Sequence, residues 1–189
     1  MALYGHKHIP FASVSSEAAA CSITFGSPSK TFNIAGIVSS YCIVPNEELR
    51  NHFFSYLSAN EFDMATIFAM TATEAAFTKG EEWRQQMISY IEGNIDFVEE
   101  YLKANIPEIT IMKPQASYLV WMNFSGLGLE HSALVDMLIN KARLAMNDGA
   151  MFGKEGEQHM RLNVGTTRAI LKQALDQPKD AVNEIKTRQ

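Results

Sequence analysis

Hydrophobic positions divide the chain into strand-like runs near its N-terminus, helical patterns in the middle and a mixture of both toward its C-terminus. Residues 21–25 and 37–44 are two apolar runs separated by a turn rich in Gly, Ser and Pro. This arrangement is typical of two strands joined by a loop. Because both runs are almost continuously apolar, they predict a sheet that is covered on two faces.

Three helices are predicted in the middle of the chain. Asn46 is a suitable N-cap for a helix that runs to about Ser58. Residues 64–77 are apolar on most sides, which indicates burial either in the core of this chain or against a partner chain. The clearest period lies in residues 81–105, where apolar residues recur every three or four positions (Trp83, Met87, Ile91, Ile95, Val98 and Leu102). This spacing predicts one long amphipathic helix.

The remaining residues predict a small domain of strands with flanking helices. Strands are predicted at 108–112, 117–124, 143–146 and 159–164, and helices at 132–142 and from Thr167 onward. Ser132 is the expected cap of the first of these helices. Residues 147–149 predict a turn, and Pro178 predicts a bend or an interruption in the last helix.

Composition narrows the class of protein. The 189 residues are 47% hydrophobic and 20% charged, which is a globular balance, and the net charge of −5 gives no reason to expect a nucleic-acid or membrane partner. Cys21 and Cys42 lie within apolar runs, so we expect buried thiols rather than a disulfide, and a cytoplasmic location. His6 and His8 lack cysteine or carboxylate partners at ligand spacing, so no metal site is expected.

Lys30 is the first candidate for chemistry, because it ends the turn between the two apolar runs. Partial burial of a lysine removes solvation from its ammonium group and favours the free amine. A free amine can attack a carbonyl carbon and form a Schiff base. The alternative is an exposed lysine in a polar turn, since turns are built from such residue types.

Arg161 is the second candidate. In the run H-M-R-L-N-V-G, strand alternation places Arg161 on the face opposite Met160 and Leu162. A guanidinium on that face can hold a carboxylate through two parallel hydrogen bonds, although a solvent-facing arginine would fit the same pattern. Tyr118, in P-Q-A-S-Y-L-V-W, could also reach a substrate, but an aromatic residue on a strand more often serves packing.

Three segments together carry a family resemblance: S-P-S-K-T-F-N-I-A-G around Lys30, G-A-M-F-G at 149–153, and R-L-N from Arg161. They resemble the fold-type I pyridoxal-phosphate enzymes of the class I/II aminotransferase superfamily, and most closely the MalY/PatB-type cystathionine β-lyases, which are C–S lyases. The resemblance implies that Lys30 binds pyridoxal 5'-phosphate (PLP) covalently and acts as the catalytic base, that Ser27 contacts the phosphate, and that Arg161 binds the substrate α-carboxylate. Many aminotransferases have an arginine eight residues after the lysine; Val38 stands there and favours the lyase branch.

The resemblance also implies an architecture of the α/β class. Residues 1–79 would be the C-terminal part of the aspartate-aminotransferase-like large-domain sheet, and residues 80–189 an α+β small domain joined by the helix at 81–105. The family's D-E-I-H segment, expected before the G-x-x-H-x-P stretch at 5–10, is absent. We therefore expect a truncated form of a longer enzyme that is inactive by itself.

The activity that the resemblance implies is β-elimination from an amino-acid substrate such as cystathionine, in a full-length homodimer with active sites at the subunit interface. Two alternatives remain open. The full-length protein could be an aminotransferase of the same fold, which would use the same lysine and arginine. The chain as it stands could also be a non-catalytic fragment or dimerisation module.

Overall fold

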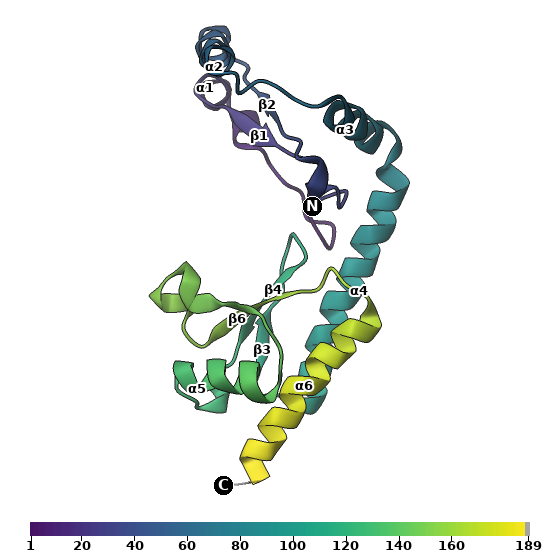
Figure 1. The fold of residues 1–189 in the computed structure, drawn as a ribbon, viewed down its shortest axis with the longest axis vertical. Coiled ribbons are helices and arrows are strands. Elements are labelled where there is room, and N and C mark those ends of the chain that lie inside the picture. Colours follow the sequence, from purple (N-terminus) through teal and green to yellow (C-terminus); the bar gives the residue numbers. More distant parts are fainter. Residues whose placement is uncertain (188–189) are drawn as a thin grey trace. The chain divides into compact units, whose positions relative to one another are not determined.

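The computed structural model describes residues 1–187, and the chain forms two compact units. The N-terminal unit contains Met1 and Lys7–Met87, and the C-terminal unit contains Ala2–His6 and Ile88–Gln189. The helices are α1 (Ser16–Ala20), α2 (Glu47–Ala59), α3 (Ile67–Lys79), α4 (Glu81–Asn105), α5 (His131–Asp136) and α6 (Arg168–Thr187) (Figure 1). The strands are β1 (Thr24–Gly26), β2 (Tyr41–Ile43), β3 (Thr110–Met112), β4 (Leu119–Asn123), β5 (Asn147–Asp148) and β6 (His159–Asn163).

In the N-terminal unit, β1 and β2 form an antiparallel hairpin in which Thr24 pairs with Ile43. Both strands are shorter than predicted. The prediction that both faces are covered is wrong for this hairpin, because the side chains of Phe25 and Ile43 are 66% and 56% exposed. Two strands cannot enclose a core by themselves, and the part of the chain that the structure describes supplies no second layer over these side chains.

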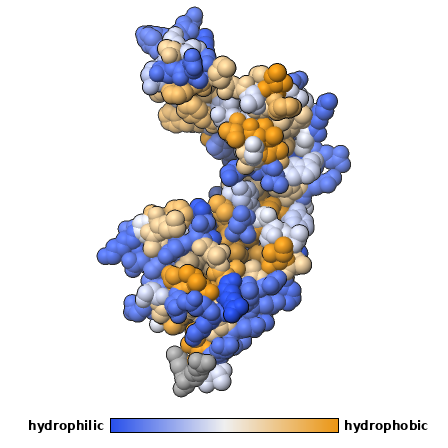
Figure 2. All heavy atoms as spheres, viewed as in Figure 1, coloured by the Kyte–Doolittle hydropathy of each residue, from blue (hydrophilic) through white to orange (hydrophobic). Residues whose placement is uncertain are grey.

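The helices of the N-terminal unit begin at side-chain caps. Asn46 Oδ1 accepts a hydrogen bond from the backbone N–H of Leu49 at the start of α2, and Thr66 caps α3 in the same way. Of the residues in α3, Ala69 alone is buried, and Phe68 is 81% exposed. Figure 2 shows hydrophobic surface over this helix. Burial of residues 64–77 within this chain is therefore not observed in the described structure, and burial against a partner stays a prediction.

The C-terminal unit is built on a four-stranded antiparallel sheet with the order β3-β4-β6-β5. Positions along β4 and β6 alternate, so that Val120, Met122, Met160 and Leu162 are buried while the intervening side chains are half-exposed or exposed. The rest of the core comes mainly from α4, α5 and α6 (Ile91, Ile95, Val98, Leu102, Leu134, Leu171 and Leu175). The alternation leaves Arg161 on the face opposite this core, as the sequence predicts.

Three predictions in this unit are wrong. Helix α5 begins at His131 after Glu130, without a side-chain cap from Ser132, and it gives way to a π-helical turn at Met137–Lys141. Residues 143–146 do not form the predicted strand. Strand β5 lies instead at Asn147 and Asp148, where the sequence predicted a turn, because these two residues pair with β6. Helix α6 continues through Pro178, so the interruption that the sequence allowed does not occur, and the alternative, a bend at Pro178, stays a prediction.

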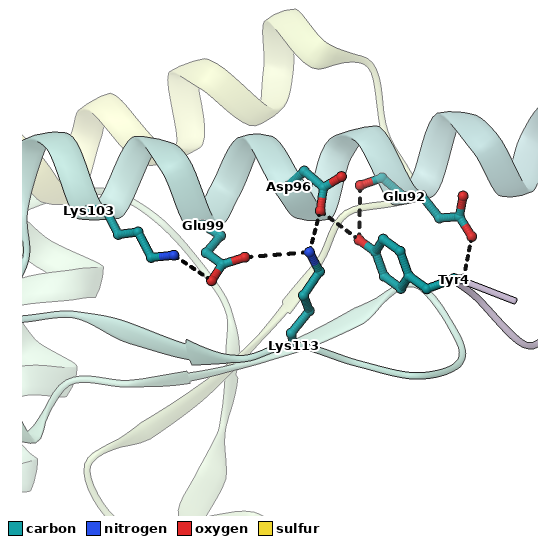
Figure 3. A network of polar contacts seen from close by, with 6 residues as sticks. All are labelled: Tyr4, Glu92, Asp96, Glu99, Lys103 and Lys113. Atoms are coloured by element: carbon teal, nitrogen blue, oxygen red, sulfur yellow. Dashed lines mark hydrogen bonds and ion pairs between the residues drawn. The ribbon is translucent and has the colours of Figure 1, made fainter. Parts of the chain in front are cut away.

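A segment from the chain's N-terminus completes the C-terminal unit. Leu3 is buried, and its N–H donates to Gln115 O at 2.9 Å. Tyr4 reaches α4, where its backbone N–H donates to Glu92 Oε1 at 2.5 Å and its hydroxyl lies 3.0 Å from Asp96 Oδ1 (Figure 3). Lys113 pairs with the same carboxylate at 2.6 Å and lies 4.5 Å from the centroid of the Tyr4 ring. Burial, and then the hydrogen bond to Asp96, raise the pKa of Tyr4.

Candidate active-site residues

Lys30 lies in a tight turn that follows β1. Phe32 N–H donates to Pro28 O at 2.9 Å, and Ile34 N–H donates to Ser29 O at 3.0 Å. The second bond closes a six-residue turn through Asn33, whose φ of 54° is a left-handed conformation that asparagine tolerates. The Lys30 side chain is exposed in this turn. The partial burial considered from the sequence is therefore not observed in the described structure.

Ser27 is fixed within the same turn. Its hydroxyl donates to Ser39 O at 2.6 Å, and its Oγ accepts the backbone N–H of Ser29 at 3.1 Å and lies 2.7 Å from Ser29 Oγ. The turn thus presents a primary amine and two hydroxyl groups within four residues. Hydroxyls suit a phosphate and the amine suits an aldehyde, so these residue types fit PLP, and phosphate binding by Ser27 would require its hydrogen to turn away from Ser39 O.

Val38 has an unusual backbone conformation beside this turn. Its φ and ψ of 54° and 64° lie in the left-handed region, and its side chain is 84% exposed. A β-branched residue in that region is an outlier, and such strain is found preferentially at functional sites. The next residue, Ser39, is bonded to Ser27 through its carbonyl and lies 2.6 Å from Thr73 Oγ1 through its own hydroxyl. These two contacts hold the strained segment in place.

Arg161 occupies the centre of β6, with Trp121 of β4 opposite on one side and Asn147 of β5 on the other. Its Nη2 donates to Asn147 Oδ1 at 3.1 Å, and its Cζ lies 4.7 Å from the centroid of the Phe152 ring. Its Nε is buried and has no partner among the described residues. A buried donor without a partner is costly, which makes this atom suited to an acceptor brought by a ligand.

A cavity of about 490 Å³ is lined in part by Arg161. Polar side chains at its wall are Asn147, Asn163 and Thr166 in addition to Arg161, and Ile170 adds an apolar side chain that is 57% exposed. A guanidinium edge beside a cavity that also contains amide and hydroxyl groups can bind a carboxylate and orient the group attached to it.

Tyr118 does not line this cavity in the described structure. It precedes β4, and its carbonyl accepts the N–H of Val164 at 2.9 Å. Its half-exposed ring lies beside Gly165, where an added Cβ would come within 3.6 Å of Tyr118 Cδ2. The structure thus gives Tyr118 a packing role against the loop after β6.

The four predicted site residues fall into two pairs. Ser27 and Lys30 share one turn of the N-terminal unit, and Arg161 and Tyr118 belong to the sheet region of the C-terminal unit. The contacts of Arg161 with Asn147 and Phe152 were missed from the sequence. Phe152 lies in the quoted segment G-A-M-F-G and could have been noticed there, whereas Asn147 could not, because its position was assigned to a turn.

Within residues 1–187, no group of three or more His, Cys, Asp or Glu side chains could hold a metal ion. Over the same residues, none of the helices combines the length and the apolar character needed to cross a membrane.

Comparisons with known proteins give the relationship. No protein-family model matches the chain. It is 42% identical over 181 residues to the cystathionine beta-lyase PatB of Bacillus subtilis, covering 96% of this chain and 47% of PatB. It is 30% identical over 169 residues to the protein MalY of Escherichia coli, covering 89% of this chain and 43% of MalY.

A solved structure gives the fold independently. The PLP-bound putative aminotransferase of Clostridium difficile 630 superimposes with a TM-score of 0.91 at 38% identity, over 96% of this chain and 47% of that protein. The chain therefore spans about half the length of the proteins that it matches. Over nearly its whole length, it is similar to the C-terminal half of the cystathionine beta-lyase PatB and of the protein MalY, and it has the fold of the PLP-dependent aminotransferases.

Proposed function

We propose that this chain is part of a PLP-dependent C–S β-lyase that cleaves cystathionine or a related S-substituted cysteine. The observation that carries the proposal is the 42% identity with a cystathionine beta-lyase over 96% of the chain. The turn at Ser27–Lys30 supports it, because it offers an amine for the cofactor aldehyde and hydroxyl groups for the cofactor phosphate. Arg161 also supports it, because it lines a cavity and its unpartnered Nε is a hydrogen-bond donor suited to a carboxylate.

In this proposal Lys30 and Ser27 hold the cofactor, through the amine and through a hydroxyl on the phosphate. Bound PLP would supply an acceptor for the electron pair left on the substrate Cα. Arg161 would bind the α-carboxylate through the guanidinium edge that includes Nε, which fixes the orientation of the Cα–H bond. The substrate amino group would replace Lys30 at the cofactor aldehyde, and the freed Lys30 Nζ would then accept the Cα proton as general base.

Loss of that proton permits the Cβ–S bond to break, with the electron pair leaving on sulfur. The sulfur then takes a proton and departs as a thiol. The three-carbon remainder reacts with water to give pyruvate and ammonia. For cystathionine the balanced reaction is cystathionine and water to homocysteine, pyruvate and ammonia.

We assign residues 1–79 to the cofactor-binding domain and residues 80–189 to the small domain. A homodimer is proposed because α3 exposes apolar side chains such as Phe68 at 81% and Ile67 at 75%, which a partner subunit would cover. A cytoplasmic location is proposed because Cys21 and Cys42 are both free thiols.

An aminotransferase is the second candidate, because the similar solved structure from Clostridium difficile carries that description at 38% identity. Val38 at the position of the aminotransferase phosphate arginine favours the lyase. The two activities differ in their products. We expect the natural polypeptide that carries this chain to release pyruvate from L-cystathionine without any keto-acid acceptor. Product formation that requires an added keto acid would support the aminotransferase instead.

A further inference from the structure

The loop that follows β6, residues 164–167, is held by one buried asparagine of α4. Asn94 is 0% exposed. Its Nδ2 donates to Val164 O at 2.8 Å and to Thr166 O at 2.9 Å, and its Oδ1 accepts from Arg168 Nε at 2.8 Å. Both amide hydrogens and the amide oxygen are thus used on one short segment. A buried polar group whose bonds are all made specifies its surroundings closely.

Residues on the same face of α4 also bind Arg168, the first residue of α6. The backbone N–H of Arg168 donates to Tyr90 Oη at 2.9 Å. Its guanidinium lies over the Phe97 ring, with Cζ 4.7 Å from the ring centroid. Gly93 leaves room for it, because an added Cβ there would lie 3.3 Å from Arg168 Nη2. Tyr90, Asn94 and Phe97 therefore fix where the loop ends.

This loop belongs to the wall of the cavity at Arg161. Gly165 and Thr166 line that cavity together with Arg161. The other side of the loop is also tied down, since Val164 N–H donates to Tyr118 O and Gly165 N–H donates to Asn163 Oδ1 at 2.8 Å. A shift of the loop would therefore change the shape of the cavity beside Arg161.

We propose that Asn94 is a positioning residue for carboxylate binding by Arg161. It does not itself line the cavity. Its Nδ2 holds the loop at 164–167 against α4, so that Gly165 and Thr166 keep their places in the cavity wall beside Arg161, where a ligand carboxylate would bind. The assignment of that carboxylate to an amino-acid substrate rests on the function proposed above, whereas the hold on the loop does not.

The substitution Asn94→Asp removes only the two hydrogen bonds that Asn94 Nδ2 donates to the loop. It keeps an oxygen acceptor for Arg168 but turns the amide donor into a second acceptor, which then faces the carbonyl oxygens of Val164 and Thr166. Asn105→Asp is the matched control on the same helix, because Asn105 is exposed and its Nδ2 donates only to Tyr101 O, at 2.8 Å, within α4.

The first measurement is hydrogen exchange by NMR on residues 1–189, which does not depend on activity. In Asn94→Asp we expect exchange of the Val164 and Gly165 amides and of the Arg161 Nε–H to become roughly tenfold faster or more, because a buried bond pair is lost. Asn105→Asp should leave these rates unchanged. Unchanged rates in Asn94→Asp, or equal acceleration throughout the C-terminal unit, would overturn the proposal.

The second measurement is steady-state kinetics with L-cystathionine in the natural polypeptide that carries this chain. Asn94→Asp should raise KM roughly tenfold with kcat changed by less than about twofold. In an Arg161→Lys background it should change KM by less than about twofold, because both substitutions act on the same contact. Independent, multiplying effects would show that Asn94 does not act through Arg161 and would overturn the proposal. If the unsubstituted protein releases no pyruvate, the proposed lyase function fails, and the exchange rates still decide the role of Asn94.

Discussion

The guanidinium of Arg161 lies over the Phe152 ring, with its Cζ 4.7 Å from the ring centroid. Asn147 Oδ1 accepts a hydrogen bond from Arg161 Nη2 at 3.1 Å. The rings of Trp121 and Phe152 pack edge to face, with their centroids 5.8 Å apart. An aromatic face and an amide together restrict the plane of the guanidinium. A fixed plane is what two parallel hydrogen bonds to a carboxylate require.

Replacing Arg161 with lysine should lower kcat/KM for amino-acid substrates about 100-fold, because a point charge replaces the planar fork and a charge-assisted contact worth ~3 kcal/mol is lost. The measurement is pyruvate release from L-cystathionine by the natural polypeptide that carries this chain. Arg143→Lys is the control, since Arg143 is exposed and outside the cavity wall. An unchanged kcat/KM in Arg161→Lys would remove Arg161 from the site.

Phe152→Leu removes the ring under the guanidinium but keeps an apolar side chain. A partly exposed cation–π contact contributes about 0.5–1 kcal/mol, so KM should rise roughly two- to fivefold while kcat stays nearly constant. Phe152 is 56% exposed, and Phe11→Leu, at 63% exposure in the N-terminal unit, is the control for loss of an exposed ring. Equal KM values for the two variants would contradict this role of Phe152.

Much of the helical structure follows from local pattern. The three- and four-residue steps from Trp83 to Leu102 predict α4 with the bounds that the structure has, because an amphipathic helix encodes its own period. Strand β5 was missed because Asn147 and Asp148 become a strand only through pairing with β6, which comes later in the chain. Pairing of that kind is a tertiary effect that local turn propensity cannot anticipate.

In the candidate site, too, local sequence motifs identify some residues and tertiary contacts decide the others. Lys30 and Arg161 stand out because a motif surrounds each of them. Asn94 was overlooked, although one signal was available: it is a polar residue on the apolar stripe of α4, between Ile91 and Val98. A buried polar side chain in such a stripe needs hydrogen-bond partners, and the search for them leads to the loop after β6.

Lys30→Ala should abolish covalent attachment of PLP. The test is reduction with borohydride followed by peptide mapping in the natural polypeptide that carries this chain, with turnover measured in parallel. Lys79→Ala, at the exposed C-terminal end of α3, is the control and should keep both labelling and turnover. Stoichiometric labelling or activity that survives Lys30→Ala would show that another lysine holds the cofactor.

Asp96 makes the C-terminal unit sensitive to acid. The hydrogen bond from Lys113, and then that from Tyr4, hold the pKa of its carboxyl below the usual value (Figure 3). The stabilisation from ionised Asp96 is therefore present above its unfolded-state pKa of about 3.9 and is lost as the pH falls below it.

Asp96→Asn should lower the free energy of unfolding at pH 7 by about 0.5–1 kcal/mol, since the ion pair is partly exposed. The difference from the unsubstituted protein should shrink as the pH falls from 5 to 3. Denaturant unfolding followed by circular dichroism at several pH values measures it. Glu100→Gln, at an exposed position of the same helix, should show no such pH dependence. A gap that stays constant down to pH 3 would exclude this origin.

Val38→Asn should stabilise the N-terminal unit. A β-branched residue in the left-handed region costs about 1–2 kcal/mol, whereas asparagine adopts this conformation readily. The conformation itself is retained in the variant, because Ser39 stays bonded to Ser27 and stays in contact with Thr73. The Val38 side chain is 84% exposed, so its removal loses little apolar burial. We expect the free energy of unfolding to rise by about 0.5–1 kcal/mol.

The control for this prediction is Val14→Asn. Val14 is also exposed, at 65%, but its φ is −76°, an ordinary right-handed value. The same loss of an apolar side chain without relief of strain should therefore change the free energy of unfolding by less than about 0.5 kcal/mol. Denaturant unfolding of both variants under the same conditions isolates the backbone contribution. If Val38→Asn is destabilising, or if Val14→Asn is stabilised equally, the backbone at Val38 holds no strain that asparagine can relieve.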